Sequence, residues 1–482
     1  MWRCCENFSP LKYALSSTLL PCCRFSSHFK APFSSHCHGK GGAAAAAGAR
    51  NEKLRVFIVA GEPSGDLIGS RLMASLRRLS PRPLQFAGVG GNLMKREGLV
   101  SEFPMEDIAV MGVAELLPHL LRIWVRLRQT VTAVMDFRPH VVVTVDAKGF
   151  SFRVLRSITD AYRRLGVSRP PLVHYVAPSS WAWKGGENKL KNLADTLDHL
   201  LCILPFEAAL FKAHGIRATY VGHPVLEDAF TSVATGENPA HCRWWIKGSK
   251  SCSRQDFGLQ SGSTVVCVLP GSRAQEVKRM LPLFESALDL LADKVPMLTA
   301  IIPTAPSRVI TDAVTEAVKG WKTPNILLPY ASEKDKYSAF AASDVSLCTS
   351  GTTVLQLQMA RVPAVVAYRA HPLTEWLIKS RTKLHYISLP NILLDSPVIP
   401  EALFADCTPK RLFTLLCQVL EDSEVKEQQA KAAEQVLSML VPPQQSVQES
   451  TGSLCSVENV FDWRPSMAAA STILTLLQID KT

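Results

Sequence analysis

The stretch LRVFIVAGEPSGDLIGSRLMASLRRL at residues 54–79 decides the fold class. It opens with a mainly apolar run at 54–60, continues through the Gly-, Ser- and Pro-containing segment 61–66, and ends with apolar residues at helical spacing over 67–79. A buried strand, a tight turn and a helix in that order form the βα unit that opens an α/β domain.

The same pattern recurs along the chain. Apolar runs that predict further buried strands lie at 84–89, 140–147, 172–177, 199–204 and 218–222, and a second series lies at 263–270, 297–303, 325–330, 344–350 and 363–369. Apolar strands that alternate with helices predict parallel sheets covered on both faces. We therefore expect two Rossmann-like halves that face each other across a cleft, with ligands bound beyond the carboxyl ends of the strands.

Length and composition set the expected domain boundaries. A chain of 482 residues is too long for one hydrophobic core. One polar, Gly/Ser-rich segment predicts a linker or insertion between the two α/β halves. A second polar segment predicts a flexible insertion before the end of the chain. The expected boundaries are a leader at 1–50, a first half at 51–230, a linker or insertion at 231–262, a second half at 263–440, a flexible insertion at 441–464 and a closing helix at 465–482.

The first 50 residues predict an organellar presequence. They are rich in Ser, Ala and basic residues, almost free of acids, and end in GKGGAAAAAGAR at 39–50. The apolar stretch at 13–20 is too short and too interrupted for a secretory signal. We expect cleavage in the mitochondrion, which is favoured over the plastid.

Charge and cysteine content exclude several classes of protein. The leader holds +5 of the net charge of +11, which leaves about +6 for the body. That mild excess suits an anionic lipid surface or phosphorylated substrates, and equally a basic organellar enzyme. No basic block with interleaved aromatics indicates nucleic acid, and no apolar run is long enough to cross a bilayer. Five of the 13 cysteines lie in the leader, and the other eight are scattered without pairing or a metal-like spacing, so we expect reduced thiols without zinc.

Carboxylates follow two strands of the first series. Glu62 and Asp66 lie in the turn after 54–60, and Asp146 stands at the carboxyl end of the run 140–147. A partly desolvated aspartate at a strand end suits a general base that deprotonates a sugar hydroxyl, whereas the alternative is an ordinary turn residue. The turn at 61–66 is not a dinucleotide fingerprint, because GxGxxG is absent, and the later GVGGNL carries Leu93 at the third glycine position.

Aromatic residues indicate two candidate contacts for acyl chains or sugars. Trp181 and Trp183 follow the strand at 172–177, where plain core packing is the alternative. Trp124 and Arg126 lie in the segment 116–131, whose apolar and basic residues recur at helical spacing. Such a helix lies on a membrane surface or binds acyl chains, or else it is a crossover helix with a basic outer face.

Two turns of the second series predict a diphosphate site. The first, LPGSRAQEVKR at 269–279, is strand, turn and helix, so helix amides and the guanidinium of Arg273 can hold a diphosphate. The second, CTSGTTVLQ at 348–356, repeats the arrangement. The alternative is two ordinary capped helices. The candidate residues are Gly271, Ser272, Arg273, Glu276, Ser350, Gly351, Thr352 and Gln356. The P-loop ending GK[ST] is missing, and so is any Asp-x-Asp pair, so we expect neither nucleotide hydrolysis nor a divalent metal.

A set of ordered motifs resembles the lipid-A-disaccharide synthase family. The motifs are AGEPSGD, GVGGNLMKREG, MEDIAVMGVAELLPHL, HYVAPSSWAWKGG, LPFE, VGHPVLE, LPGSRAQEV, SGTTVLQ and SLPNIL. The resemblance implies a GT-B fold, with an acceptor and lipid domain first and a UDP-binding domain second. It implies inverting transfer of 2,3-diacylglucosamine from UDP to the 6-hydroxyl of 2,3-diacylglucosamine 1-phosphate. It also implies peripheral membrane attachment, on the matrix side in a mitochondrion, with no metal or cofactor.

The resemblance also implies roles for particular residues. Asp146, Glu62 and Asn391 correspond to catalytic positions, and Arg273 corresponds to the diphosphate ligand. The expected acceptor and lipid contacts are Met111, Trp124, Arg126, Trp181 and Trp183. Two departures stand out. The family's SGTxxLE ends here in Gln356, which must hold the ribose hydroxyls without charge assistance, and its DAPDF reads DAKGF at 146–150.

Two other functions stay open at this point. A UDP-sugar epimerase would share the two-domain architecture but would not need the basic amphipathic segment at 116–131. A catalytically weakened lipid- or UDP-sugar-binding homologue is suggested by Gln356 and the two polar insertions. A homodimer is the candidate assembly, without a residue pattern that decides it.

Overall fold

The fold is taken from a computed structural model, which describes residues 53–108, 113–186, 190–231, 244–246, 248–305, 307–441 and 464–479. The expected leader, Met111 and nearly all of the expected insertion at 441–464 lie outside these residues. The chain divides into two compact units, Met1–Leu172 and Val173–Thr482, and each is treated by itself.

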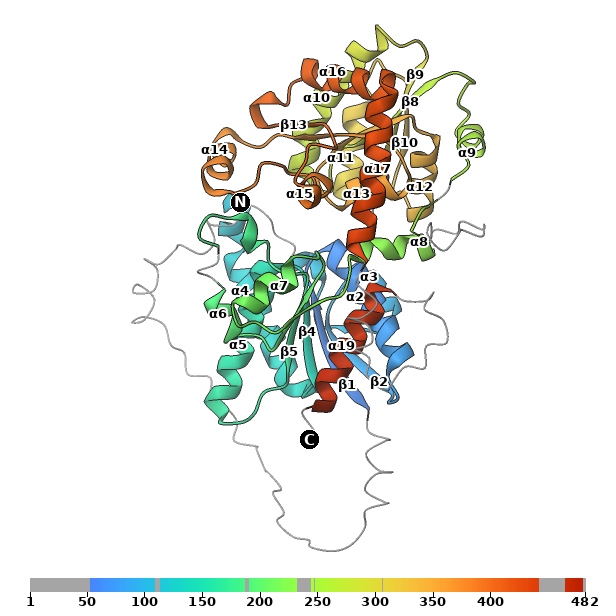
Figure 1. The fold of residues 1–482 in the computed structure, drawn as a ribbon. Coiled ribbons are helices and arrows are strands. Elements are labelled where there is room, and N and C mark those ends of the chain that lie inside the picture. Colours follow the sequence, from blue (N-terminus) through green and yellow to red (C-terminus); the bar gives the residue numbers. More distant parts are fainter. Residues whose placement is uncertain are drawn as a thin grey trace, which may run out of the picture. The chain divides into compact units, whose positions relative to one another are not determined.

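The first unit is built on parallel strands in the order β3-β2-β1-β4 (Figure 1). Its strands are β1 (Leu54–Ala60), β2 (Leu84–Val89), β3 (Val100–Ser101) and β4 (Val141–Val145). Its helices are α2 (Pro63–Leu79), α3 (Asn92–Arg96), the 3-10 turn η2 (Met105–Asp107), α4 (Val113–Phe137) and α5 (Lys148–Leu165). Strand β1 lies between β2 and β4 and is buried almost throughout, as its continuous apolar run predicts.

The second unit begins with three parallel strands in the order β5-β6-β7. These are β5 (Leu172–Tyr175), β6 (His199–Cys202) and β7 (Ala218–Tyr220). The helical segments between and after them are η3 (Ser180–Ala182), α6 (Lys191–Ala194), α7 (Glu207–Ala213), η5 (Pro224–Glu227), α8 (Asp228–Thr231) and α9 (Lys250–Asp256).

A six-stranded parallel sheet follows, in the order β10-β9-β8-β11-β12-β13. Its strands are β8 (Thr264–Leu269), β9 (Leu298–Pro303), β10 (Asn325–Leu328), β11 (Val345–Thr349), β12 (Ala364–Tyr368) and β13 (Glu401–Leu403). Its helices are α10 (Ala274–Ala292), α11 (Arg308–Val318), α12 (Glu333–Ala342), α13 (Thr352–Met359), α14 (Pro372–Arg381), α15 (Leu389–Leu394), the 3-10 turn η7 (Phe404–Asp406), α16 (Pro409–Glu421) and α17 (Ser423–Leu440).

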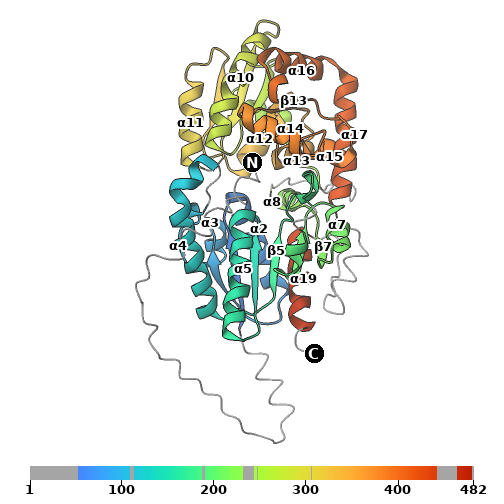
Figure 2. The same cartoon turned by 90° about the vertical axis from the view of Figure 1, so that its left-hand side faces the viewer.

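Alternating side chains bury both faces of this six-stranded sheet. Val266 and Val268 of β8 pack with α10, α11 and α16. Cys267 and Leu269 of the same strand pack with α12, α13 and α17 on the opposite face. Figure 2 shows α10 and α11 side by side along this sheet. The side-chain period of two in a strand therefore serves two cores at once, which produces the three-layer α/β architecture expected from the sequence.

The later segments show what the apolar pattern could not predict. The short strands β3 and β13 had no sequence signal. Within 231–262, expected as a linker or insertion, the structure has helix α9 and the buried Trp245 and Ile246, which belong to the core that includes α13 and α17.

The last described helix is α19 (Pro465–Ile479). The buried carboxylate of Glu227 accepts hydrogen bonds from the backbone N–H and the hydroxyl of Ser466 (2.7 and 2.9 Å), which holds the start of α19. The sequence-based domain boundaries stay predictions.

None of the described helices combines the length and apolar character needed to cross a membrane.

Candidate functional site

Two candidate residues of the first unit meet where β1 and β4 end. Ala60 pairs with Val145 across these parallel strands, so the turns that follow lie side by side. Glu62 caps the start of α2, and Asp146 follows β4 directly. The hydroxyl of Ser64 donates to the Asp146 carboxylate at 3.4 Å. Both carboxylates are only partly buried, so a ligand can reach this edge of the sheet.

The backbone around Asp146 adopts a conformation that L-residues rarely take. Asp146 and Ala147 have φ of 49° and 42°, in the left-handed region. The hydroxyl of Ser151 donates to the Asp146 carbonyl at 2.8 Å and supports this turn. Strained turns of this kind persist where the surroundings fix them, and they cluster at functional sites.

Gly61 sets the distance between the two turns. A Cβ at Gly61 would lie 2.7 Å from the Cβ of Ala147 and 3.3 Å from Cδ1 of Ile108. Any side chain here would therefore push the β4 turn away from the β1 turn.

We expect Gly61→Ala to destabilise the fold by about 1–3 kcal/mol, the usual range for an overpacked position. Because the displaced turn carries Asp146, turnover should fall further than the loss of folded protein explains. Urea denaturation and the rate per folded molecule measure the two effects separately. The control is Gly166→Ala, whose added Cβ meets nothing within 4 Å although its φ of 64° carries a backbone cost. A variant that matches the native chain in both quantities would contradict the close approach.

Asp66 serves the fold rather than the ligand. Its carboxylate is buried and accepts hydrogen bonds from the backbone N–H groups of Gly91, Leu93 and Met94 at 2.8–3.1 Å. These are the free amides at the start of α3, so Asp66 caps that helix from a distance.

The first diphosphate candidate lies at the end of β8. Gly271 has φ of 117°, and a Cβ there would lie 2.7 Å from the Glu276 carboxylate. Arg273 caps the start of α10, and its exposed guanidinium donates to Glu276 at 3.2 Å. The pair holds the guanidinium beside the exposed Ser272 and the first turn of α10. This arrangement can bind an anion through both charge and amides.

The second candidate turn lies next to the first. Strands β8 and β11 are adjacent and parallel, and the hydroxyl of Thr349 lies 3.4 Å from a Cβ built on Gly271. Ser350 donates from its hydroxyl to the carbonyl of Ile387 at 2.9 Å, so its side chain is already used within the loop. Gly351 and Thr352 are exposed at the start of α13. The structure thus brings together the two second-half turns that the sequence singled out.

Gln356 has a buried partner that the sequence did not indicate. Its side-chain amide is 8% exposed and donates to the Asp228 carboxylate at 2.7 Å. The Tyr337 hydroxyl donates to the same oxygen at 3.1 Å, and Asp228 is 1% exposed. An adjacent acid pair after an apolar run, Glu227 and Asp228, was the only sequence signal for this residue.

Asn391 on α15 is completely buried, and its amide bonds residues that follow this helix. The amide nitrogen donates to the Ile399 carbonyl and to Glu401 at 2.8 Å each, and its oxygen accepts from the Ile399 N–H at 2.8 Å. Glu401 in turn accepts from the Ser388 N–H at 2.9 Å. Through these bonds Asn391 ties α15 to the segment that leads into β13.

The aromatic candidates divide by exposure. Trp124 on α4 is 50% exposed and lies under the Arg128 guanidinium at 4.1 Å. Arg126 donates to Asp107 at 2.9 Å and packs on Phe103, so it holds α4 to the preceding turn. In the second unit, the Trp181 indole N–H donates to the buried Glu207 at 3.1 Å. Trp183 forms an isolated bridge with Thr382. Trp181 thus fits the packing alternative.

The chain matches a known protein family over most of its length. A family model described as lipid-A-disaccharide synthetase matches residues 56–453. The chain belongs to the lipid-A-disaccharide synthetase family. A protein from Arabidopsis thaliana named "Probable lipid-A-disaccharide synthase, mitochondrial" is 49% identical over 424 residues, covering 88% of this chain and 91% of that one. The lipid-A-disaccharide synthase of Rhodospirillum centenum is 43% identical, covering 85% and 96%.

Solved structures agree with this family at the level of the fold. UDP-GlcNAc 2-epimerase from Neisseria meningitidis, bound to UDP-GlcNAc, aligns with a TM-score of 0.55 at 12% identity, covering 89% of this chain and 100% of that one. The S. aureus MnaA co-structure with UDP aligns with a TM-score of 0.56 at 11% identity, covering 83% and 95%. These structural alignments establish the α/β fold with two Rossmann-like, GT-B-like domains, as predicted.

This member of the lipid-A-disaccharide synthetase family carries two buried acids that sequence reasoning did not single out, Glu207 and Asp228, and the partly buried Glu401. In the described part of the chain, no three His, Cys, Asp or Glu side chains come together as a metal site.

Proposed function

We propose that this chain is a lipid-A-disaccharide synthase that transfers 2,3-diacylglucosamine from UDP to the 6-hydroxyl of 2,3-diacylglucosamine 1-phosphate. The products are the β-1,6-linked disaccharide 1-phosphate and UDP. The observation that carries the proposal is the family match over residues 56–453, which includes every turn with candidate site residues.

Asp146 is the proposed general base. It stands at a strand end beside the Glu62 turn, and its left-handed backbone fixes the direction of its carboxylate. In an inverting displacement this carboxylate takes the proton from the attacking hydroxyl while the sugar–phosphate bond breaks on the opposite face. Glu62 lies in the neighbouring turn, where it can orient the acceptor sugar by accepting from its hydroxyls.

Arg273 is the proposed ligand of the departing diphosphate. Its guanidinium can make two parallel hydrogen bonds to phosphate oxygens, and Glu276 holds it in place. The exposed Gly351 and Thr352 offer the amides at the start of α13 as further donors. Charge that develops on UDP is then stabilised by an arginine and helix amides.

We expect Arg273→Ala to weaken the binding of UDP and of the UDP-sugar donor alike, by about tenfold or more, because a charge-assisted hydrogen bond is lost. Titration calorimetry with UDP measures this directly. The matched control is Arg308→Ala, which removes an exposed arginine that also pairs with a carboxylate on its own helix. Equal UDP affinity in the two variants would exclude Arg273 from the diphosphate site.

Gln356 is the proposed contact for the uridine ribose. Its amide donates to Asp228, which leaves its side-chain oxygen to accept from a ribose hydroxyl. The carboxylate of Asp228 lies directly behind the amide and polarises it. The missing charge at position 356 is thus partly supplied by the residue behind it.

Acyl-chain and membrane contact is proposed for the exposed side of α4. Leu121, Trp124 and Val125 are 79%, 50% and 47% exposed and lie at i, i+3 and i+4 on that helix. Arg128 is stacked on Trp124 next to them. An apolar strip with adjacent cations suits acyl chains and anionic lipid head groups. We further propose a mitochondrial location on the matrix side of the membrane, supported by the leader composition and by the name of the Arabidopsis relative, and a homodimeric assembly.

The test of the proposed function is UDP release by the purified chain. Release should require the acylated UDP-sugar and the acyl-sugar phosphate together, and neither alone. Incubation with UDP-N-acetylglucosamine alone tests for an epimerase and should leave this sugar nucleotide unchanged. A chain that binds both acylated sugars and releases no UDP would be a binding homologue, and the proposal would be wrong.

A further inference from the structure

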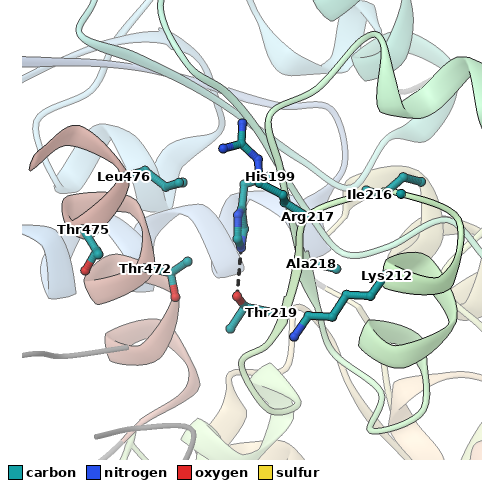
Figure 3. Close-up of a pocket in the computed structure, with 10 residues that line it drawn as sticks. His199, Lys212, Ile216, Arg217, Ala218, Thr219, Thr472, Thr475 and Leu476 are labelled. Atoms are coloured by element: carbon teal, nitrogen blue, oxygen red, sulfur yellow. Dashed lines mark hydrogen bonds between the residues drawn. The ribbon is translucent and has the colours of Figure 1, made fainter. Parts of the chain in front are cut away.

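A pocket lies between helix α19 and the strands β6 and β7 (Figure 3). Its volume is about 590 Å³, within the range of roughly 300–1,000 Å³ typical of small-molecule sites. Strand β7 is the last in its sheet order, so no further strand covers this side. No residue that lines the pocket belongs to the proposed transfer site.

The walls of this pocket are mainly apolar. Ile216, Ala218 and Leu476 line it, together with Thr472 and Thr475. The two threonine hydroxyls donate to carbonyls of their own helix, Thr472 to Ala468 at 2.9 Å and Thr475 to Ser471 at 3.0 Å. Their hydrogen-bonding capacity is therefore partly used, and an acyl chain could lie along this side without leaving those donors unpaired.

The polar part of the lining is basic. Lys212 and Arg217 line the pocket, and none of its described lining residues is acidic. The Nε–H of Arg217 donates to the Asp198 carbonyl at 2.9 Å, and the Nη2 atom of Arg217 lies 3.7 Å from the Asp198 carboxylate. Lys212 is exposed and has no ion pair within the described ranges. One of the two cations is thus partly neutralised and the other is available to a ligand.

His199 also lines the pocket and lies near both of its cations. Its Nε2 shares a hydrogen bond with the Thr219 hydroxyl at 2.8 Å, as Figure 3 shows. Burial lowers the pKa of His199 to about 4, with further lowering by Arg217 and Lys212 that Asp198 opposes. The imidazole is therefore neutral at pH 7, and both cations of the lining act on it.

We propose that this pocket binds an amphiphile with one acyl chain and one anionic head group, a phosphate monoester or a carboxylate. The chain lies between α19 and the strands, and the head group pairs with Lys212, whereas Arg217 points to the other side of His199 and stays with Asp198 (Figure 3). An inorganic anion would leave the apolar walls wet, and an uncharged amphiphile would leave Lys212 without an ion pair. The inference does not depend on the proposed transfer reaction.

The test uses the full chain and three probes in titration calorimetry: a lysophosphatidic acid below its micelle concentration, the monoacylglycerol of the same chain length, and inorganic phosphate. We expect saturable binding of lysophosphatidic acid only. Lys212→Gln should weaken it about tenfold, because one charge-assisted contact is lost. The matched control is Lys410→Gln, an exposed lysine on α16. Transferase turnover should be the same in all three chains.

A second variant tests the apolar part. Thr475→Trp places an indole in the pocket and should abolish binding of lysophosphatidic acid, while Lys212→Gln remains the test should this variant fail to fold. Binding of the same lipid in neutral phosphatidylcholine vesicles distinguishes a bilayer source from a free amphiphile. Equal affinity for monoacylglycerol or for phosphate, or equal affinity of Lys212→Gln and Lys410→Gln, would overturn the proposal.

Discussion

Replacement of Asp146 by Asn is expected to lower kcat by about 10²- to 10⁴-fold, the range that a positioned general base contributes. The amide has the shape of the carboxylate but cannot take a proton from the acceptor hydroxyl. Ser64 and Ser151 can still support the turn, since one bonds the Asp146 side chain and the other its backbone carbonyl. The affinity for the UDP-sugar donor should therefore stay close to that of the native chain.

The measurement is single-turnover transfer with saturating substrates, alongside donor binding by calorimetry. Asp160→Asn is the matched control, because Asp160 is an exposed aspartate on α5 that pairs only with Arg163 among the described residues. If the Asp146 variant kept about a tenth or more of the native rate, proton transfer by this residue would be excluded. A large loss of donor affinity would instead indicate a binding role.

Gln356→Glu, which restores the residue implied by the family resemblance, is expected to destabilise this chain by about 3–5 kcal/mol. The Gln356 amide nitrogen lies 2.7 Å from the Asp228 carboxylate, and both side chains are buried. A glutamate there would place two carboxylates in contact without solvent between them. One would have to take up a proton, or the two would have to move apart.

Urea denaturation at neutral pH measures this loss, and Gln418→Glu, on the exposed side of α16, is the control. Asp228→Asn should rescue the Gln356→Glu chain, because an asparagine amide can donate to the new carboxylate. The two single variants and the double variant form a cycle with a large favourable coupling. Additive effects would contradict the buried contact between positions 228 and 356.

Much of the fold could be predicted because its signals are local. The run at 54–60 is a strand over the same residues as β1, and the alternating faces of β8 serve two cores. The turns with Glu62 and Asp146 in the first unit, and with Arg273 and Thr352 in the second, could be predicted as candidate sites. Within each sheet, parallel strands end at the same edge, where ligands bind. The short strand β13 pairs with β12 at the end of the sheet order, and no periodicity in three residues can reveal it.

The buried acids could not be predicted, since their partners are distant in sequence. Asp66 bonds amides 25–28 residues away, and Asp228 bonds Gln356 from 128 residues away. Sequence patterns give exposure and period but not such pairings. Asn391 on α15 bonds Ile399 and Glu401 through its amide, contacts that the sequence did not indicate, and its catalytic role stays a prediction.

Mass spectrometry of the reaction product shows whether the chain joins the two acylated sugars. The purified chain is supplied with UDP-2,3-diacylglucosamine and 2,3-diacylglucosamine 1-phosphate, each with an acyl chain of different length. We expect one new species, whose mass equals the summed masses of the two substrates minus the mass of UDP. Its fragmentation should show a β-1,6 linkage. Recovery of both substrates unchanged, or of free diacylglucosamine with UDP, would contradict it.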